Sequence, residues 1–208
     1  MSKKNKIFFS TLIFFSGVSF GCFAGPAAAQ APQQEIESFF SSLRSMEFPV
    51  TDPAQHARTV ELADAALDVK SLGEKALGSH WADFSHDQQE VFVDVLRKLI
   101  ENIAYPRAHK FLDAQTITYQ TPKSIDRGVE LSSSLTAQET GLQVPVVYNL
   151  YEDNGRWKVY DIFLDGISMT EDLQFQFDKV IQDSGIFGLI EQMGARLTRA
   201  QTENSGRS

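Results

Sequence analysis

Apolar residues recur every three or four positions along the first part of the chain, which is the spacing of one face of an α-helix. The pattern predicts a helix from about residue 35 to near Pro49, a second helix over residues 53–69, and a short helix in "SLGEKALGSHW" that Gly78 closes. The apolar positions of the first two helices are Ile36, Phe39, Phe40, Leu43, Met46, Ala57, Val60, Ala63 and Leu67. The N-terminal part of the fold is therefore expected to be helical.

A longer helix is predicted to begin at Ser85. Gln88 follows three residues later, and this spacing is typical of a capping box, in which each side chain accepts a hydrogen bond from the other residue's backbone amide. The apolar face of this helix consists of Phe92, Val95, Leu96, Leu99 and Ile103. Because proline has no amide hydrogen and its ring clashes with the preceding turn, we expect Pro106 to end or kink the helix.

The middle of the chain changes to a period of two, which is the alternation of a β-strand. Residues 115–121 and 128–136 alternate in this way, and "VPVVYNLYEDNGRWKVYDIFL" predicts a hairpin over residues 144–164. Asn154 and Gly155, at the centre of the hairpin, tolerate the positive φ angles of a type I′ turn. The sequence thus predicts an antiparallel meander of about four strands.

After the hairpin the helical period returns. Ser168 and Glu171 have the spacing of a second capping box, and Gly185 interrupts the helical pattern that follows. N-terminal helices, an antiparallel meander and C-terminal helices packed on the sheet together define an α+β fold.

The last strand of the hairpin, in "RWKVYDIFLDGISM", loses its alternation after Val159. If Asn154 and Gly155 form the turn, Asp161 lies opposite Tyr148 and both faces of the hairpin base carry apolar side chains. A β-bulge near Tyr160 would also produce this pattern, because it switches the facing of the residues beyond it. In either case the hairpin base has apolar side chains on both sides, which predicts helices on both faces, or helices on one face and a ligand cavity or a partner on the other.

The first 29 residues have the features of a secretory signal peptide. Lys3, Lys4 and Lys6 precede the uncharged stretch "IFFSTLIFFSGVSFGCFA", and "AAA" at 27–29 supplies a cleavage site. An uncleaved membrane anchor is the alternative, because the apolar stretch approaches the length that spans a bilayer. Cys22 is the only cysteine, and lipid anchoring there is not expected because Ser19 stands where a lipoprotein signal needs an aliphatic residue.

Cleavage after residue 29 would leave a mature protein without cysteine, which is typical of an exported bacterial protein that folds in the periplasm without disulfides. It would also remove three lysines, leaving 16 basic and 27 acidic residues and a net charge of −11. Such a charge argues against a nucleic-acid partner and against adsorption to anionic lipid by charge alone.

The histidines do not indicate a metal site. His80 and His86, with Asp83 and Asp87, form the one local group of possible ligands, but their spacing matches no zinc signature. We therefore expect no metal and no cofactor.

The sequence gives no positive support for catalysis. Ser168 lacks the second glycine of a nucleophile elbow, and its role as a helix cap explains it better. Asp161 and Asp165 fall on one strand face, where a hydrogen bond from Tyr148 to Asp161 is a simpler use than paired-carboxylate chemistry. We therefore expect a protein that is not an enzyme.

Three stretches resemble one known family. "ALGSHWADFSHDQQEVFVDVL", "VPVVYNLYEDNGRWKVYDIFLDGISM" and "FQFDKVIQDSGIFGLIEQM" are similar to segments of the MlaC-like, toluene-tolerance proteins, and the similarity covers most of residues 70–197. These proteins are periplasmic carriers that shuttle phospholipid between an inner-membrane ABC transporter and an outer-membrane lipoprotein complex. Two positions depart from the family pattern: Gln174 stands where the family often has arginine, and Pro106 where its long helix usually continues.

The resemblance implies an apolar cavity between sheet and helices that holds phospholipid as cargo, with the headgroup near solvent. At about 0.8 kcal/mol per methylene, a two-chain lipid is held back from water by something on the order of 20 kcal/mol, which apolar side chains must replace. The candidate lining residues are Val146, Tyr148, Val159, Ile162 and Leu164 on the hairpin, and Leu96, Leu99, Ile103, Phe177, Ile181 and Leu189 on the helices.

The expected organisation is a signal peptide (1–29), a linker (30–34), a single lipid-binding α+β domain (35–198) and a flexible tail (199–208). The expected partners are phospholipid, an inner-membrane ABC transporter complex and an outer-membrane lipoprotein complex. A periplasmic adaptor with a fully packed core, or a carrier of another hydrophobic ligand, is the alternative.

Overall fold

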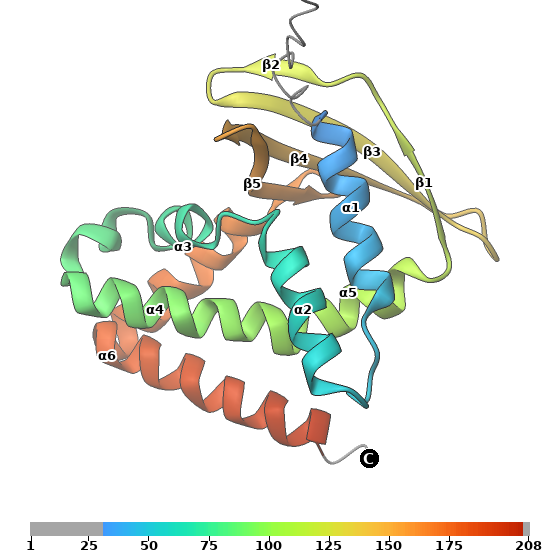
Figure 1. Ribbon diagram of the computed structural model, residues 1–208. Helices are drawn as coiled ribbons and strands as arrows, with labels where there is room; N and C mark the ends of the chain where they lie inside the picture. The colour runs from blue at the N-terminus through green and yellow to red at the C-terminus, as the bar shows by residue number, and fades with distance from the viewer. Residues whose placement is uncertain (1–30, 206–208) are drawn as a thin grey trace, which may run out of the picture.

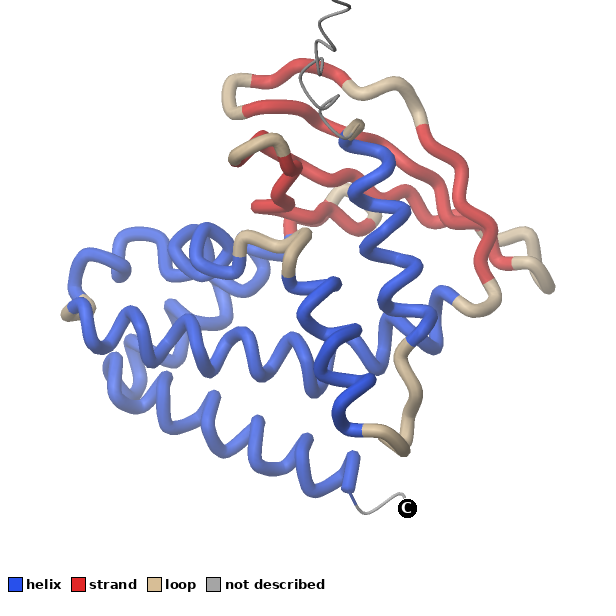
Figure 2. Tube along the Cα trace, viewed as in Figure 1, coloured by secondary structure: helices blue, strands red, loops and turns tan. Residues whose placement is uncertain are grey.

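The computed structural model describes residues 31–205, so the signal peptide and Cys22 lie outside the described residues. Strands and helices occupy different parts of the molecule, with α1 lying across the sheet and α3, α4 and α6 gathered beyond its β5 side (Figures 1 and 2). The predicted α+β architecture is confirmed.

The helical elements follow the predicted order. They are α1 (Pro32–Ser45), α2 (Pro53–Asp64), α3 (Val69–Leu77), a 3₁₀ turn η1 (Gly78–Asp83), α4 (His86–Leu99), a π-helical segment η2 (Ile100–Ala104), α5 (Tyr105–Leu112) and α6 (Met169–Ser205).

The described strands form one antiparallel six-stranded sheet in the order β1-β3-β4-β5-β6, with β2 also paired to β3. The strands are β1 (Gln115–Tyr119), β2 (Lys123–Ile125), β3 (Gly128–Ala137), β4 (Gln143–Asp153), β5 (Arg156–Leu164) and β6 (Ile167–Ser168). The two strands beyond the predicted four, β2 and β6, have three and two residues, too few to show a period.

Local signals in the sequence place several element boundaries correctly. Ser85 Oγ accepts a hydrogen bond from Gln88 N at 3.3 Å, and Gln88 Oε1 accepts one from Ser85 N at 2.8 Å, so the predicted capping box is confirmed. The turn between β4 and β5 has φ angles of 51° at Asn154 and 81° at Gly155. Both angles are positive, as a type I′ turn requires.

The second helix ends earlier than predicted. α2 stops at Asp64, and the next residues run alongside β5 instead of continuing the helix to residue 69. Val159 N donates to Ala66 O at 2.8 Å, and Asp68 N donates to Val159 O at 2.9 Å. The free edge of β5 satisfies these backbone groups, which is why the helical spacing of Leu67 does not decide its conformation.

Both ends of the domain are more ordered than expected. α1 begins at Pro32, inside the segment predicted to be a linker, and α6 continues to Ser205, inside the predicted flexible tail. Pro106 does not end the helical stretch: it lies at the start of α5, directly after the π-helical segment in which the α-helical geometry of α4 is interrupted. The Asn102 carbonyl, four residues before Pro106, accepts a hydrogen bond from Asn204 Nδ2 at 3.0 Å, and this bond attaches the end of α6.

A β-bulge accounts for the lost alternation in β5. Leu150 pairs with Val159 but Asn149 pairs with Asp161, so Tyr160 is an extra residue without a partner on β4. Val159 and Ile162 therefore face the same side as Leu150 and Tyr148, while Asp161 turns to the other side. The bulge, one of the two explanations that the sequence left open, is confirmed, and the predicted pairing of Asp161 with Tyr148 is wrong.

One apolar core joins the sheet to the helices. The face of the sheet toward α1, here called the inner face, packs against aromatic side chains of that helix: the Phe40 and Tyr148 rings meet edge to face, with centroids 6.0 Å apart. Phe39 meets Tyr105 of α5 in the same way at 6.2 Å. Beyond β5 the core continues between α3, α4 and α6, where Phe92 is fully buried.

Replacing Gly128 with alanine is expected to destabilise the fold strongly. Gly128 has a φ of 98°, and an added Cβ would lie 2.1 Å from the Leu150 carbonyl oxygen. We expect the free energy of unfolding, measured with urea, to fall by about 3 kcal/mol or more. The control is Gly141→Ala, at a φ of 69° with no atom within 4 Å, where a loss of about 1 kcal/mol is expected. Equal losses in the two variants would contradict the steric explanation.

Candidate binding site between the sheet and the helices

The hairpin supplies the sheet side of the candidate site. Val146, Tyr148 and Val159 lie on the inner face with exposed fractions of 3%, 1% and 0%, and Ile162 is half-buried beside them. Tyr148 Oη is not bonded to Asp161 but lies 3.4 Å from Ser133 Oγ, which donates to it. Burial raises the pKa of Tyr148, so its hydroxyl stays neutral within the apolar face.

The helices supply the other side. Leu96 on α4 and Phe177 and Leu189 on α6 are buried, and Phe177 meets the Phe92 ring edge to face with centroids 5.7 Å apart. Leu99 and Ile181 are half-buried and pack against the same core.

The structure brings most of the predicted lining residues into one apolar cluster. Ile103 is half-buried in the π-helical segment and Leu164 is 40% exposed at the end of β5, and neither of them belongs to the cluster. The side chains of the cluster pack against one another. The predicted cavity, and the lining role of each residue, therefore stay predictions.

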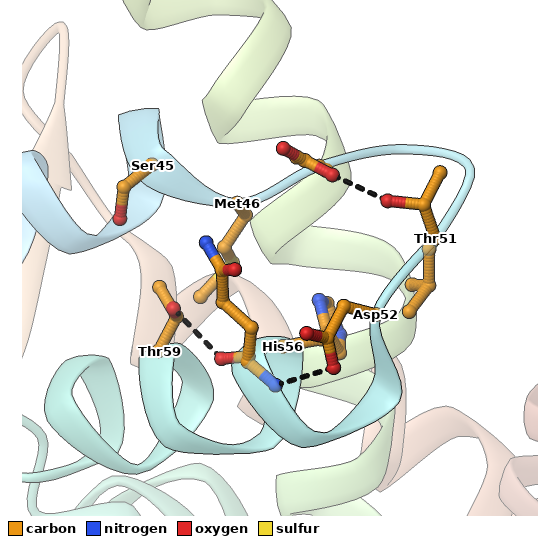
Figure 3. A pocket seen from close by; sticks show the side chains of 9 residues that line it. Ser45, Met46, Thr51, Asp52, His56 and Thr59 are labelled. Carbon is orange, nitrogen blue, oxygen red and sulfur yellow. Dashed lines mark hydrogen bonds between the residues drawn. The ribbon is translucent and has the colours of Figure 1, made fainter.

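Two hollows lie away from this cluster. Figure 3 shows one beside the connection between α1 and α2, where Asp52 Oδ1 accepts hydrogen bonds from Ala54 N and Gln55 N. Its volume of about 10 Å³ has room for no more than a water molecule. The other, of about 320 Å³, is an open hollow on α3 and α4 with Trp81 and Val93 among charged side chains. Neither suits an acyl chain, because one is too small and the other is open to solvent, with Lys70, Glu90, Asp94 and Arg97 in its lining.

A buried carboxylate fixes the hairpin base to the neighbouring helices. Asp161 is fully buried, and Lys75 of α3 pairs with its Oδ2. Ser168 Oγ donates to the same oxygen at 2.8 Å, while the backbone amides of Ile162 and Thr170 donate to Oδ1 at 2.9 and 3.4 Å. The donors are supplied by α3, by β5 itself, by β6 and by the start of α6, so the carboxylate holds these elements together.

A second polar group joins the outer face of the hairpin to the segment before α3. Tyr151 Oη donates to Asp68 Oδ2 at 2.6 Å, and the Arg127 guanidinium lies over the rings of Tyr151 and Tyr160, 4.4 and 4.6 Å from their centroids. Burial by itself would raise the pKa of Asp68, but hydrogen bonds from Ser71 and Tyr151 and the charge of Arg127 outweigh it and lower the pKa. Asp68 therefore stays ionised as an acceptor for these groups.

The links between helices and sheet are thus unevenly distributed. Polar links concentrate along β5 and near the hairpin turn, where Lys158 also donates to the Ala65 carbonyl and Arg156 pairs with Glu35 of α1 at 3.3 Å. Across the inner face of β3 and β4, apolar contacts dominate. Apolar contacts are not directional, so the two layers can separate there without leaving a network of broken hydrogen bonds.

Two kinds of feature are absent from residues 31–205. Their histidine, cysteine, aspartate and glutamate side chains form no group of three or more arranged to hold a metal ion. Within the same range, no helix is both long enough and apolar enough to cross a membrane.

Comparison with known proteins agrees with this architecture. The family model described as "MlaC protein" matches residues 28–195, which is most of the chain. The chain belongs to the MlaC family. The resemblance noted in the sequence is therefore confirmed.

Two relatives of this MlaC family member give a measure of the likeness. The intermembrane phospholipid transport system binding protein MlaC of Haemophilus influenzae is 25% identical over 167 residues, which cover 77% of this chain and 78% of the relative. The structure of a phospholipid-binding protein from Ralstonia solanacearum, solved in complex with a phospholipid, superposes with a TM-score of 0.66 at 23% identity. The match covers 84% of this chain and 99% of that one, so the two proteins share their fold.

The Asp161→Asn variant is expected to lower the free energy of unfolding by about 2–4 kcal/mol, because the amide nitrogen that replaces Oδ2 in this buried position can neither accept the Ser168 hydrogen bond nor pair with Lys75. Urea unfolding of the purified protein measures the change. Asp94→Asn is the matched control, since the Lys98–Asp94 pair is exposed and its loss should cost no more than about 0.5 kcal/mol. A loss at Asp161 as small as that at Asp94 would show that the carboxylate does not hold the elements together.

Proposed function

We propose that this protein carries phospholipid between two membranes, and that it holds the acyl chains within the apolar core between the inner face of the sheet and the helices. The observation that carries the proposal is the apolar face of the sheet from β3 to β5, which meets the helices mainly through apolar contacts. The chain that contains this face is a member of the MlaC family. The name of the Haemophilus relative and the bound phospholipid of the Ralstonia protein support it.

The uneven links between the layers supply a physical route to loading. Separating sheet from helices exposes apolar side chains to water at roughly 25 cal/mol per Å². Acyl chains that enter the gap restore this apolar contact, so bound lipid stabilises the open form. In this proposal the packed form described above is the empty carrier. The Asp161 and Asp68 groups would keep the hairpin attached to α3 and to the start of α6 while the apolar contacts between sheet and helices open.

The proposed lining consists of the candidates on both sides of this gap. They are Val146, Tyr148, Val159, Ile162 and Leu164 on the sheet, and Leu96, Leu99, Ile103, Phe177, Ile181 and Leu189 on the helices. Leu99 directly precedes the π-helical segment and Ile103 lies within it. Such departures from α-helical geometry are frequent at functional sites.

The setting of the carrier is part of the proposal. A cleavable signal peptide would place it in the periplasm, between an inner-membrane ABC transporter complex and an outer-membrane lipoprotein complex that deliver and receive the lipid. No catalytic step or cofactor is required. The hydrogen bonds and ion pair of Asp161 favour a structural role for this carboxylate over chemistry on a substrate.

A second candidate function is that of an adaptor that docks on a membrane complex and holds no lipid. One observation favours it: the buried candidates pack against one another in the structure. The two functions differ in what the purified protein contains.

Protein purified from the periplasm is expected to carry about one phospholipid per chain, measured by organic extraction and mass spectrometry. In the Leu99→Trp variant the larger ring would occupy space beside the π-helical segment, so we expect less lipid per chain and a stability cost of about 1–3 kcal/mol.

Val91→Trp is the control, because Val91 is 49% exposed on α4 and its replacement leaves the core unchanged. Wild-type protein that contains no lipid and takes none from vesicles would overturn the carrier function and support the adaptor. Full lipid content in Leu99→Trp would instead remove the π-helical segment from the proposed site and leave the function standing.

A further inference from the structure

The turn between β5 and β6 fixes the direction of the apolar side chains beside it. Asp165 and Gly166 have φ angles of 50° and 80° and form a two-residue turn, so Leu164 lies directly opposite Ile167. Partners in an antiparallel pair share a face of the sheet. Ile167 therefore lies on the inner face with Leu164, and the next residue, Ser168, points the other way to Asp161.

Exposure rises steadily along this face. Val146, Leu164 and Ile167 are neighbours across three strands, and their exposed fractions are 3%, 40% and 63%. Along β5 the same trend runs from the fully buried Val159 through the half-buried Ile162 to Leu164. An isolated apolar residue on a surface is ordinary. Here the exposed residues are instead the outer end of a row that begins in the core.

Met169, at the first position of α6, adds a third apolar side chain, 38% exposed. We call Leu164, Ile167 and Met169 the apolar rim. The rim is held rigidly, because the buried Ser168 between Ile167 and Met169 bonds Asp161 and also accepts a hydrogen bond from Glu171 N at 3.2 Å. A rigid apolar surface costs little conformational entropy when it meets a partner.

The charges beside the rim are acidic. Asp165 is exposed in the turn, and Glu171 and Asp172 are exposed in the first turn of α6. These carboxylates repel a surface of anionic headgroups and attract the ammonium groups that lie outermost on a zwitterionic phospholipid surface. The rim thus combines an apolar row that continues into the core with a charge that suits zwitterionic lipid.

We infer that the apolar rim is the mouth through which acyl chains pass between a zwitterionic phospholipid surface and the inner face of the sheet. The inference rests on the proposed function, since it assigns a route to a cargo that the carrier must hold. It assigns Ile167 and Met169 to the transfer step, together with Leu164 at the exposed end of the proposed lining, whereas the buried lining residues hold the lipid afterwards.

The test is the rate at which the empty protein takes a fluorescent phospholipid from phosphatidylcholine vesicles. Ile167→Ser should slow uptake about tenfold, because the transition state loses most of the transfer free energy of one isoleucine side chain. The fraction of protein that is loaded at equilibrium should not change. Leu142→Ser is the matched control, since Leu142 is 66% exposed in the turn between β3 and β4, and its rate should equal that of the wild type.

A charge variant tests the acidic side of the mouth. Asp165→Asn keeps a residue type that tolerates a positive φ and removes one negative charge. It should speed uptake from vesicles that contain phosphatidylglycerol, because a repulsion is lost, and slow uptake from phosphatidylcholine vesicles, because an attraction to the ammonium groups is lost.

The outcomes separate the mouth from the carrier function. Wild-type protein that contains no lipid when purified and takes none from vesicles overturns the proposed function. Wild-type protein that contains lipid when purified, but takes none from vesicles once emptied, overturns the mouth and leaves the proposed function standing. If the wild type loads, the mouth is overturned by an Ile167→Ser rate equal to the wild type, which would leave the rim as a protein-contact surface. It is also overturned by equal slowing in Leu142→Ser, or by a fall in equilibrium loading that matches the fall in rate, which would make Ile167 part of the storage site.

Discussion

Tyr160 is one residue more in β5 than β4 can pair, and this insertion determines the facing of the hairpin base. It turns Ile162 and Leu164 to the inner face and sends Asp161 to the opposite side, where Lys75, Ser168 and the amide of Thr170 enclose it. Without the extra residue, a carboxylate would enter the apolar face and be expensive to bury. Because of the bulge, one side of β5 presents apolar side chains to the helical core, and the other side presents the Asp161 carboxylate to α3 and to the start of α6.

This sorting gives the molecule two kinds of interface. At the edge of β5, hydrogen bonds and an ion pair with defined directions fix the helices to the sheet. Across the inner face, apolar side chains meet through contacts that another apolar body can replace. A carrier needs both properties, because it must open for its cargo without losing the relative placement of its parts. The same division explains why the residues proposed to line the site are also the residues of the core.

The sequence predicted those features that short segments determine. Ser85 with Gln88, Asn154 with Gly155 and the helical period after Ser168 all act within a few residues, and each marks the element boundary that the structure shows. The sequence also showed that β5 loses its alternation at Tyr160, although it left the cause open.

Features that depend on distant partners were missed or wrong. α2 ends at Asp64 because the edge of β5 offers backbone groups from almost a hundred residues away, which no local period can show. Asp161 was matched to Tyr148, whereas its partner Lys75 is 86 residues distant in the chain. The short strands β2 and β6 form by pairing with longer neighbours and leave no pattern of their own. Whether the apolar residues enclose a cavity depends on the distance between sheet and helices. The pattern of apolar residues along the chain does not determine this distance.

Gly185 gives α6 a mechanical property that neither arm of the helix has alone. Its backbone leaves the helical region, with φ 69° and ψ −178°, between an arm attached at Ser168 to the sheet and an arm attached at Asn204 to the π-helical segment. Each arm is a stiff helix that is attached at its outer end, so the angle between the two arms can change only at Gly185. Any widening of the space between sheet and helices would therefore be converted into a rotation at this glycine. Its position in the chain sets how far the two pinned ends can move apart.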